Sequence, residues 1–314
     1  MSAPRTWLQR LLGREANAPA PGDDDLFDDD TQRRLEYLAV VSRRLFAGRL
    51  RAERRTRKSG TGIEFADHRD YAAGDDLRNL DWHVYARTDR LLVKLFEEEE
   101  DLTIYVIVDS SASMAFGDGR KFVHARRLAA ALAYVGLANL DRVALLGWSG
   151  GVAKRMPPAR GKGRIFKVFE FLRALRADGE TDLAAAARTF AAENKRRGVA
   201  ILVSDLYDPA GFERGLNAIR YQKFEPMVVH VVDPAEVDPT AHGDLVLEDV
   251  ETGAEREVTL TPDLVARYRA QHALWRKEIE AFCAARQVPY AVADIHGAFE
   301  DQVLDLFRRM GGRR

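Results

Sequence analysis

Carboxylate and hydroxyl side chains follow directly on an apolar run in the first half of the chain. Residues 103–108 are rich in β-branched and apolar side chains, and Asp109, Ser111 and Ser113 come next at alternate positions. Such a run predicts a strand buried on both faces, as in the centre of a parallel sheet. Open α/β sheets bind ligands beyond the carboxyl ends of their strands. We therefore expect the three side chains to converge on one point, in a crevice that faces solvent.

Two later positions add oxygen ligands of the same kind. Thr181 follows a glycine turn and begins a predicted helix, and Asp205 comes just after the apolar run 199–203. Hard oxygen ligands suit Mg²⁺, although one carboxylate would hold it too weakly alone. An octahedral ion on these groups would keep at least one position open for water or an incoming acid. We expect Mg²⁺, with Mn²⁺ or Ca²⁺ as alternatives, on five side chains: Asp109, Ser111, Ser113, Thr181 and Asp205.

Composition excludes several classes of protein. The chain of 314 residues has 48 basic and 49 acidic side chains, so its balance does not indicate nucleic-acid binding. Its single cysteine, Cys283, allows no internal disulfide and suits a reducing compartment. No apolar run approaches the roughly 18 residues that a membrane span needs, and the first residues lack the apolar core of a secretory signal. We expect a cytoplasmic protein without a membrane span.

The order of predicted elements divides the chain into three parts. Residues 1–30 are expected to be a disordered tail, because they are rich in Ala, Pro and Asp. Residues 31–101 read as a helix at 31–46 and a β-rich segment. From residue 102 to 310 strands alternate with helices, which predicts an α/β fold with a doubly wound, mainly parallel sheet. The strand at 91–96 and a hairpin insertion at 244–260 should lie outside this sheet, because no crossover helix joins them to a parallel neighbour.

Charged motifs before residue 102 admit more than one interpretation. The basic patch Arg43–Lys58 lacks interleaved aromatic residues, which favours a solvated or internally paired face over nucleic-acid binding. Asp75 and Asp76 could bind a metal or cap a helix. The arginines beside them favour structural ion pairs.

The five oxygen ligands resemble a known ion site. The Asp-x-Ser-x-Ser loop at 109–113, with Thr181 and Asp205 on two further loops, is similar to the metal-ion-dependent adhesion site of the von Willebrand factor type A domain. The resemblance implies that these side chains surround the ion and that a carboxylate of a partner protein completes its shell. It extends over the strand and helix order of residues 102–310.

The upstream segment resembles a bacterial family called domain of unknown function fifty-eight. The similarity rests on Gly60-x-Gly62-x-Glu64-Phe65, Arg69-x-Tyr71, Gly74-Asp75-Asp76-x-Arg78, Asp81-Trp82, Ala86-Arg87 and Lys94-x-Phe96-Glu97. It implies a type A-like domain that works with a MoxR-type AAA+ ATPase. Many relatives carry N-terminal membrane spans, which this chain lacks. We therefore expect a non-enzymatic, Mg²⁺-dependent protein-binding module.

A hydrolase is the main alternative. Gly147-x-Ser149-x-Gly151 matches the nucleophile elbow of α/β-hydrolases, and Asp205 or Asp233 followed by His296 gives their triad order. The elbow must turn from strand into helix, whereas here it leads into a segment containing Pro157-Pro158. A metal-dependent hydrolase is a second form of this alternative. Gly161-Lys162-Gly163 lacks the spacing of a P-loop, and the histidines lack zinc-ligand spacing.

Overall fold

The computed structural model describes residues 29–46, 55–59, 64–99, 103–116, 119–239 and 243–311. Residues 1–28 of the expected tail, the Gly60-x-Gly62 motif and residues 47–54 of the basic patch lie outside these ranges, whereas residues 29 and 30 belong to a helix. The described chain forms two compact units by its internal contacts. The larger unit contains the candidate ion site.

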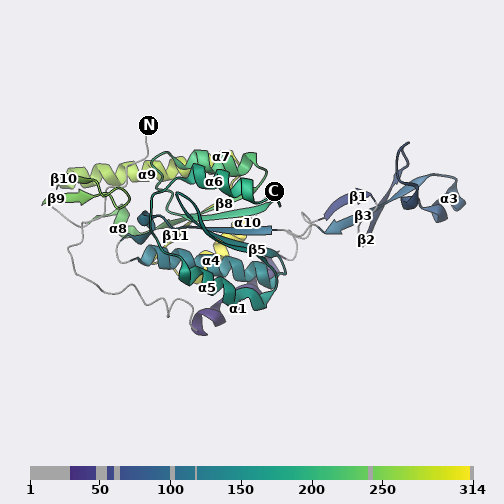
Figure 1. Cartoon of the computed structure of the whole chain (residues 1–314), viewed down its shortest axis with the longest axis horizontal. Coiled ribbons are helices and arrows are strands. Elements are labelled where there is room, and N and C mark those ends of the chain that lie inside the picture. The colour runs from purple at the N-terminus through teal and green to yellow at the C-terminus, as the bar shows by residue number, and fades with distance from the viewer. Residues whose placement is uncertain are drawn as a thin grey trace. The chain divides into compact units, whose positions relative to one another are not determined.

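A sheet of six strands forms the centre of the larger unit (Figure 1). Its strands lie in the order β11-β8-β7-β4-β5-β6. All neighbours are parallel except β6, which pairs antiparallel with β5 at the edge. The fold is therefore mixed α/β with a mostly parallel central sheet, as the sequence predicted. The strands are β4 Thr103–Asp109, β5 Arg142–Ser149, β6 Gly151–Ala159, β7 Gly198–Ser204, β8 Glu225–Val232 and β11 Tyr290–Asp294.

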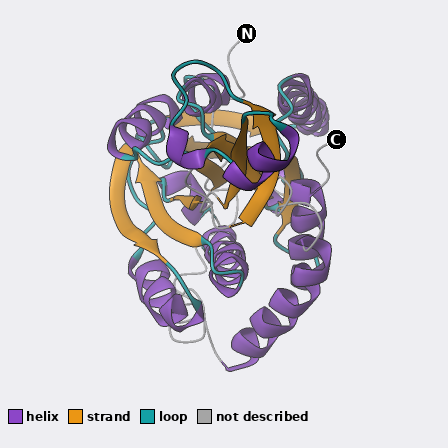
Figure 2. Ribbon diagram, turned by 90° about the vertical axis from the view of Figure 1, so that its right-hand side faces the viewer, coloured by secondary structure: helices purple, strands orange, loops and turns teal. Residues whose placement is uncertain are grey.

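Helices cover both faces of this sheet (Figures 1 and 2). One face is covered by α6 Leu183–Glu193, α7 Phe212–Tyr221 and α9 Pro262–Ala285. The other face is covered by α4 Arg120–Ala138 and α5 Ile165–Ala174, with α10 Phe299–Gly311 beside α4. The nineteen-residue α4 is buried along nearly its whole length, which its Ala-rich and Leu-rich sequence permits. A one-turn helix, α8 Pro234–Val237, follows β8.

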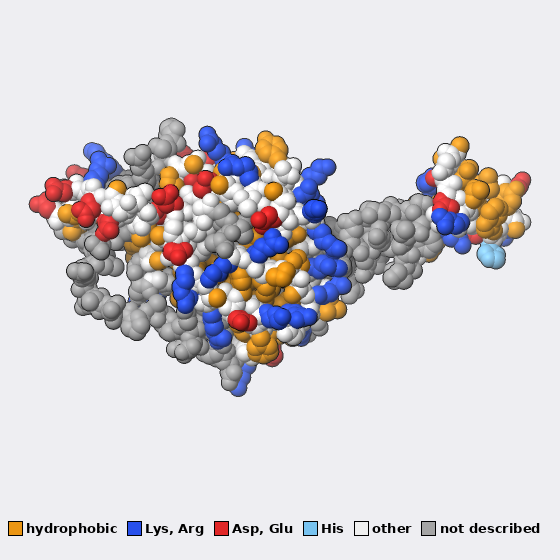
Figure 3. Space-filling model, viewed as in Figure 1, with side chains coloured by type: hydrophobic (Ala, Val, Ile, Leu, Met, Phe, Trp, Pro, Cys, Tyr) orange, Lys and Arg blue, Asp and Glu red, His pale blue; other side chains and the backbone are white. Residues whose placement is uncertain are grey.

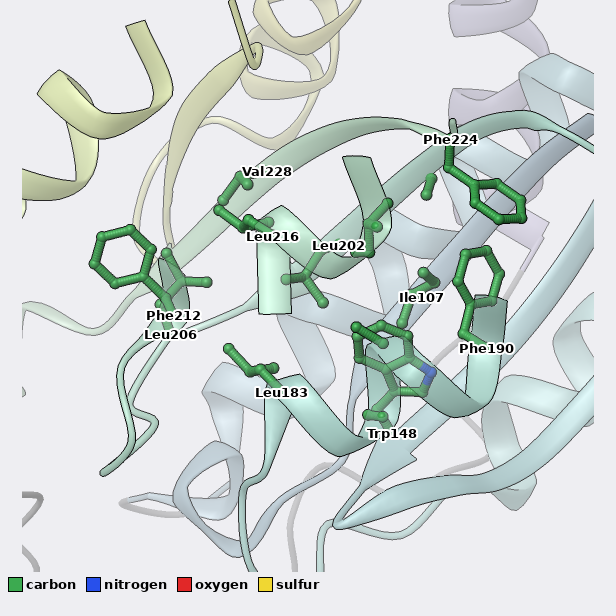
Figure 4. Close-up of a cluster of buried hydrophobic side chains, with 14 of the residues drawn as sticks. Ile107, Trp148, Leu183, Phe190, Leu202, Leu206, Phe212, Leu216, Phe224 and Val228 are labelled. Carbon is green, nitrogen blue, oxygen red and sulfur yellow. The ribbon is translucent and has the colours of Figure 1, made fainter. Parts of the chain in front are cut away.

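The core beneath α6, α7 and α9 combines aliphatic side chains with a group of aromatic ones (Figure 4). Phe190 of α6 lies 5.1 Å from Tyr105 of β4 and 6.0 Å from Trp148 of β5, measured between ring centroids. Both pairs are edge to face, the arrangement that aromatic quadrupoles favour. Because β4 is fully buried, it holds its carboxyl end, and the loop after it, in a fixed position.

The smaller unit, residues 44–102, contains a separate antiparallel sheet in the order β1-β3-β2. Its strands are β1 Arg55–Ser59, β2 Glu64–Asp70 and β3 Leu92–Glu99. The prediction that residues 91–96 lie outside the main sheet is confirmed. The unit also contains α3 Trp82–Thr88, which sequence periodicity missed because it is only seven residues long.

The paired acids of the smaller unit serve structure. Asp75 accepts two hydrogen bonds from the Arg69 guanidinium, at 2.7 and 2.8 Å. Asp76 pairs with Arg78 and caps the short 3₁₀ helix Leu77–Asn79. The interpretation as ion pairs, favoured over a metal, is confirmed.

Two further elements lie beside the main sheet. Helix α1, Asp29–Phe46, packs on the larger unit: Leu35 and Leu38 are buried, and Arg34 forms an ion pair with Glu300 of α10. The strands β9 Gly243–Glu248 and β10 Glu255–Leu260 pair with each other as a two-stranded hairpin separate from the main sheet, as predicted. Among the described residues, no helix combines the length and apolar character needed to cross a membrane.

Candidate metal site

The carboxyl ends of β4 and β7 define the site. These two strands are parallel neighbours in the sheet. From β4 the chain continues to β5, which pairs with one edge of β4, whereas β7 pairs with its other edge. This is the topological switch point where open α/β sheets bind ligands. Asp109 ends β4, and Asp205 follows β7 directly.

Asp109 is buried and surrounded by neutral donors. Its Oδ1 accepts hydrogen bonds from the backbone N–H of Ser111 (3.0 Å) and from Ser111 Oγ (2.7 Å). Its Oδ2 accepts a short hydrogen bond of 2.5 Å from Ser204 Oγ. The residue is only 1% exposed, so the expectation of a solvent-facing carboxylate was wrong. The loops after β4 and β7 close over it.

The two predicted serines lie together beside Asp109. Ser111 Oγ and Ser113 Oγ are 2.9 Å apart, and both residues are buried. Ser113 belongs to the 3₁₀ helix Ala112–Ala115, whose turn brings the two hydroxyls onto one side. A hydroxyl that donates its proton to a carboxylate keeps its lone pairs for a cation. The Asp-x-Ser-x-Ser loop therefore forms the compact oxygen cluster that the spacing predicted.

Asp205 has a partner that no local sequence pattern predicts. Lys121, in the first turn of α4, donates to Asp205 Oδ2 at 2.7 Å and to Glu236 Oε1 at 2.5 Å. The lysine side chain is fully buried, and Asp205 and Glu236 are nearly so. Asp205 Oδ1 accepts the N–H of Tyr207. One lysine thus donates to two buried acids, Asp205 and Glu236.

The backbone is constrained just after Asp205. Leu206 has a φ of 61° although it is a buried, branched residue. Its N–H donates to Ser204 Oγ, the same hydroxyl that donates to Asp109. A non-glycine residue in the left-handed region costs of order 1–3 kcal/mol and is held there by its surroundings. The hydrogen bonds that hold Leu206 in this conformation also hold Ser204 at the end of β7.

Thr181 is held by a different acid. Its Oγ1 donates to Glu251 Oε1 at 2.6 Å, and its N–H donates to Glu251 Oε2 at 3.0 Å. Glu251 lies in the turn between β9 and β10. The contacts described for Thr181 therefore join it to the hairpin, whereas those of Ser111 and Ser113 join them to Asp109.

The loop before Thr181 is tied to the loop after β4. Asp178 N–H donates to the Ser110 carbonyl (2.8 Å), and Ala112 N–H donates to the Gly179 carbonyl (3.0 Å). Gly179 has a φ of +80°, and a Cβ on it would lie 2.5 Å from Ser149 Oγ, so a side chain there would be strained and would displace the Ser149 hydroxyl. These bonds bring the segment that bears Thr181 next to the Asp109 loop.

Burial and charge set the protonation of the site. Burial, reinforced by Asp205, raises the pKa of Asp109 to about 7. Burial also raises the pKa of Glu236 to about 7, against the opposing effect of Lys121. Burial lowers the pKa of Lys121, but Asp205 and Glu236 outweigh it, so the net pKa is raised above its usual value. Burial raises the pKa of Glu251, and Asp205 adds to this shift.

The separations suit a small octahedral ion. Oxygen ligands at the 2.0–2.1 Å typical of Mg²⁺ lie about 3 Å apart along an octahedral edge. The oxygens of Asp109, Ser111 and Ser113 are separated by 2.7 and 2.9 Å. Within the described ranges, no three His, Cys, Asp or Glu side chains converge as a metal-binding group. A site here would thus depend on hydroxyl ligands beside its carboxylates.

Ser149 does not have the surroundings of a nucleophile. It ends β5, and the chain returns antiparallel through Gly150 into β6, so the turn leads into a strand instead of the helix that the elbow requires. Its Oγ donates to the backbone carbonyl of Asp178. His296, the base of the alternative triad, is exposed. Ser149 is a structural support for the loop that bears Thr181.

Four residues of this region were missed in the sequence: Lys121, Ser204, Glu236 and Glu251. Ser204 could have been noticed, because it stands beside Asp205 at the end of an apolar run. The other three give no local signal. Lys121 looks like an ordinary charged residue of a first helical turn, and Glu236 and Glu251 lie in segments that reach the site only through the fold.

With its mostly parallel sheet and a polar cluster at the switch point, the chain is an α/β protein of a ligand-binding topology. Residues 67–278 match the model of a family described as "Protein of unknown function DUF58". The chain belongs to this family.

Mycobacterial relatives match along most of the chain. Uncharacterized protein Rv1480 of Mycobacterium tuberculosis and uncharacterized protein Mb1516 of Mycobacterium bovis are each 30% identical over 256 residues. Each match covers 79% of this chain and 80% of the relative. Uncharacterized protein MAV169 of Mycobacterium avium is 39% identical over 83 residues, which cover 26% of this chain and 48% of the relative.

Two solved structures from Bacteroides have a remote likeness. The conserved hypothetical protein BatB of Bacteroides thetaiotaomicron has a TM-score of 0.42 at 13% identity, covering 67% of this chain and 98% of its own. An aerotolerance-related membrane protein of Bacteroides fragilis has a TM-score of 0.41 at 12% identity, covering 68% and 100%.

Proposed function

We propose that this chain is a non-enzymatic protein-binding module whose ion site works like the metal-ion-dependent adhesion site of von Willebrand factor type A domains. The proposal rests mainly on Asp109. Asp109 is 1% exposed, yet its three hydrogen bonds within the described part of the chain all come from neutral donors. Burying an unpaired charge is costly. A cation bound to Asp109 and the two serines would remove that cost.

In the proposed site, Asp109 supplies the main charge, and Ser111 and Ser113 supply neutral oxygens. Lys121 already neutralises part of the charge on Asp205, so Asp205 would bind the ion directly or through water with reduced strength. Thr181 would add a third hydroxyl. The bound ion would supply an electrophilic centre for a carboxylate. Low protein charge at the site leaves the ion attractive to a partner's Asp or Glu, which favours adhesion over tight sequestration.

A calorimetric Mg²⁺ titration tests the site. The wild-type chain should bind Mg²⁺, and Asp109→Asn should weaken binding by more than about 100-fold because it removes the charge while keeping the shape. Ser111→Ala should weaken it less, since water can replace a neutral hydroxyl. Equal Mg²⁺ affinity of Asp109→Asn and wild type would refute the ion site.

The family resemblance points to a MoxR-type AAA+ ATPase, or a client protein of such an ATPase, as the partner. A purified ATPase of this type can be captured on immobilised wild-type chain in saturating Mg²⁺. Because the ATPase itself uses Mg²⁺, the informative control is the Asp109→Asn chain and not a chelator. Equal capture by both chains would show that the ATPase does not bind through the ion site.

A further inference from the structure

The turn between β9 and β10 places an acid on a predicted ion ligand. Both carboxylate oxygens of Glu251 accept hydrogen bonds from Thr181, one from the hydroxyl and one from the backbone N–H. The two residues are 70 positions apart in the sequence. Thr181 is nearly buried, at 8% exposed. The contact therefore joins Thr181 to the turn of the hairpin.

The hairpin is built to hold Glu251 there. Asp249 Oδ1 accepts the N–H groups of Glu251 and Thr252, and Asp249 also exchanges backbone hydrogen bonds with Gly253 and Ala254. Leu247 and Leu260 are buried and anchor the two strands to the larger unit. The position of Glu251 is thus fixed at the turn and at both strands.

The hairpin is also strongly acidic, and acidic side chains gather over its end of the larger unit (Figure 3). One arginine, Arg256, accompanies six acids on the segment: Asp244, Glu248, Asp249, Glu251, Glu255 and Glu257. An acidic partner approaching the site would meet repulsion from this surface. An acid of the hairpin stabilises a bound cation only where its carboxylate contacts the ion or a ligand of the ion. Glu251 contacts Thr181.

We propose that Glu251 is an internal acid of the ion site, which orients Thr181 and occupies the position that a partner's carboxylate would take. This inference rests on the proposed function. A carboxylate that accepts the proton of a ligating hydroxyl fixes its orientation and strengthens it as a ligand. A partner's acid would then have to displace the hairpin, so the site is closed until a suitable partner competes.

The first test is a Mg²⁺ titration of four full-length chains: wild type, Glu251→Gln, Glu257→Gln and Asp109→Asn. Glu251→Gln keeps the size of the side chain and removes its charge. It should bind Mg²⁺ about tenfold more weakly than wild type. Glu257→Gln is the matched control, because Glu257 is an exposed acid of the same hairpin. It should bind like wild type.

The outcomes separate the two proposals. If Asp109→Asn loses Mg²⁺ while Glu251→Gln and wild type bind equally, the ion site stands and the role of Glu251 is refuted. If wild type binds no more Mg²⁺ than Asp109→Asn, both proposals fail. Thermal melts of each chain establish that the substitutions leave the fold intact.

Displacement of Glu251 by a partner's carboxylate is tested with a labelled oligoglutamate peptide in saturating Mg²⁺. Glu251→Gln should bind the peptide at least about threefold more tightly than wild type, because removing an internal competitor raises the fraction of open site. Hydrogen exchange at residues 249–254 of wild type should speed up when the peptide binds. Equal peptide affinity of the two chains, or an unchanged exchange rate, would overturn displacement.

Discussion

Asp109 and Asp205 are both buried carboxylates at strand ends, yet they are satisfied in different ways. Asp205 is bonded to a buried ammonium group, whereas Asp109 receives only hydroxyl and amide donors. A buried acid without a positive partner either takes up a proton or binds a cation. The two aspartates should therefore respond differently when their surroundings are altered.

Asp109→Asn should be at least as stable as wild type in the absence of divalent ions, because it removes a buried charge and keeps the size of the side chain. At Mg²⁺ one hundred times its dissociation constant, wild type should gain about 2.7 kcal/mol. The variant should gain nothing. Thermal melts of both chains with Mg²⁺ and with EDTA measure this. A wild-type melting temperature that is independent of Mg²⁺ would count against the site.

Lys121→Met should destabilise the protein by about 3–5 kcal/mol, because it leaves Asp205 and Glu236 buried without their shared cation. Adding Glu236→Gln to this variant should restore part of the loss, since one of the two charges is removed. Urea unfolding of the single and double variants gives both values. A double variant no more stable than Lys121→Met would mean that charge burial is not the cause.

At the scale of elements, three loops and a hairpin assemble the site around the ends of β4 and β7. The loop after β4 is bonded to the segment 178–179, and that segment is supported by Ser149. The hairpin then closes on Thr181. Each element contributes one or two groups, so a change in a supporting loop should weaken the site without removing it.

Ser149→Ala should weaken Mg²⁺ binding by less than about tenfold, because it frees the Asp178 carbonyl and loosens the loop that bears Thr181. Thr88→Ala is the matched control: its hydroxyl also donates to a backbone carbonyl, that of Val84, but in the smaller unit. Mg²⁺ titrations compare the two. Esterase activity that Ser149→Ala abolishes would instead favour the hydrolase alternative.

For the whole molecule, the core contains histidines that folding keeps neutral. Burial lowers the pKa of His230 to about 3 and that of His272, with help from Arg276, to about 4. Both start from 6.5 in the unfolded chain. Below pH 6.5 these histidines therefore bind protons in the unfolded chain but stay neutral in the folded chain. The free energy of unfolding decreases as the pH falls from 6.5 towards the pKa of each histidine in the folded state.

The contribution of His272 can be isolated with His272→Gln, which does not titrate. As pH falls from 6.5 to about 4, wild type should lose about 2–3 kcal/mol of stability relative to the variant. Comparing the two chains cancels the opposite trends of Asp109 and Glu236, whose pKa values are raised. Urea unfolding at several pH values measures the difference. Parallel stability curves would show that His272 is not a buried neutral group.

The sequence by itself determined the order of most strands and helices and the clustering of three of the five candidate side chains. Apolar runs predicted β4, β7 and β8, because a strand buried on both faces must be apolar along its length. The spacing of Asp109, Ser111 and Ser113 is local, so a single loop brings them together as expected. Short elements such as α3 and α8 were missed, since one or two turns show no periodicity.

Only the tertiary structure decided which charges meet. Lys121 joins Asp205 and Glu236 across 84 and 115 positions, and Glu251 reaches Thr181 across 70. No local pattern records such pairs, because a charged side chain on a helix or turn looks the same in sequence whether it faces solvent or a buried partner. The burial of Asp109 was misjudged for the same physical reason: exposure depends on the loops that close over a residue.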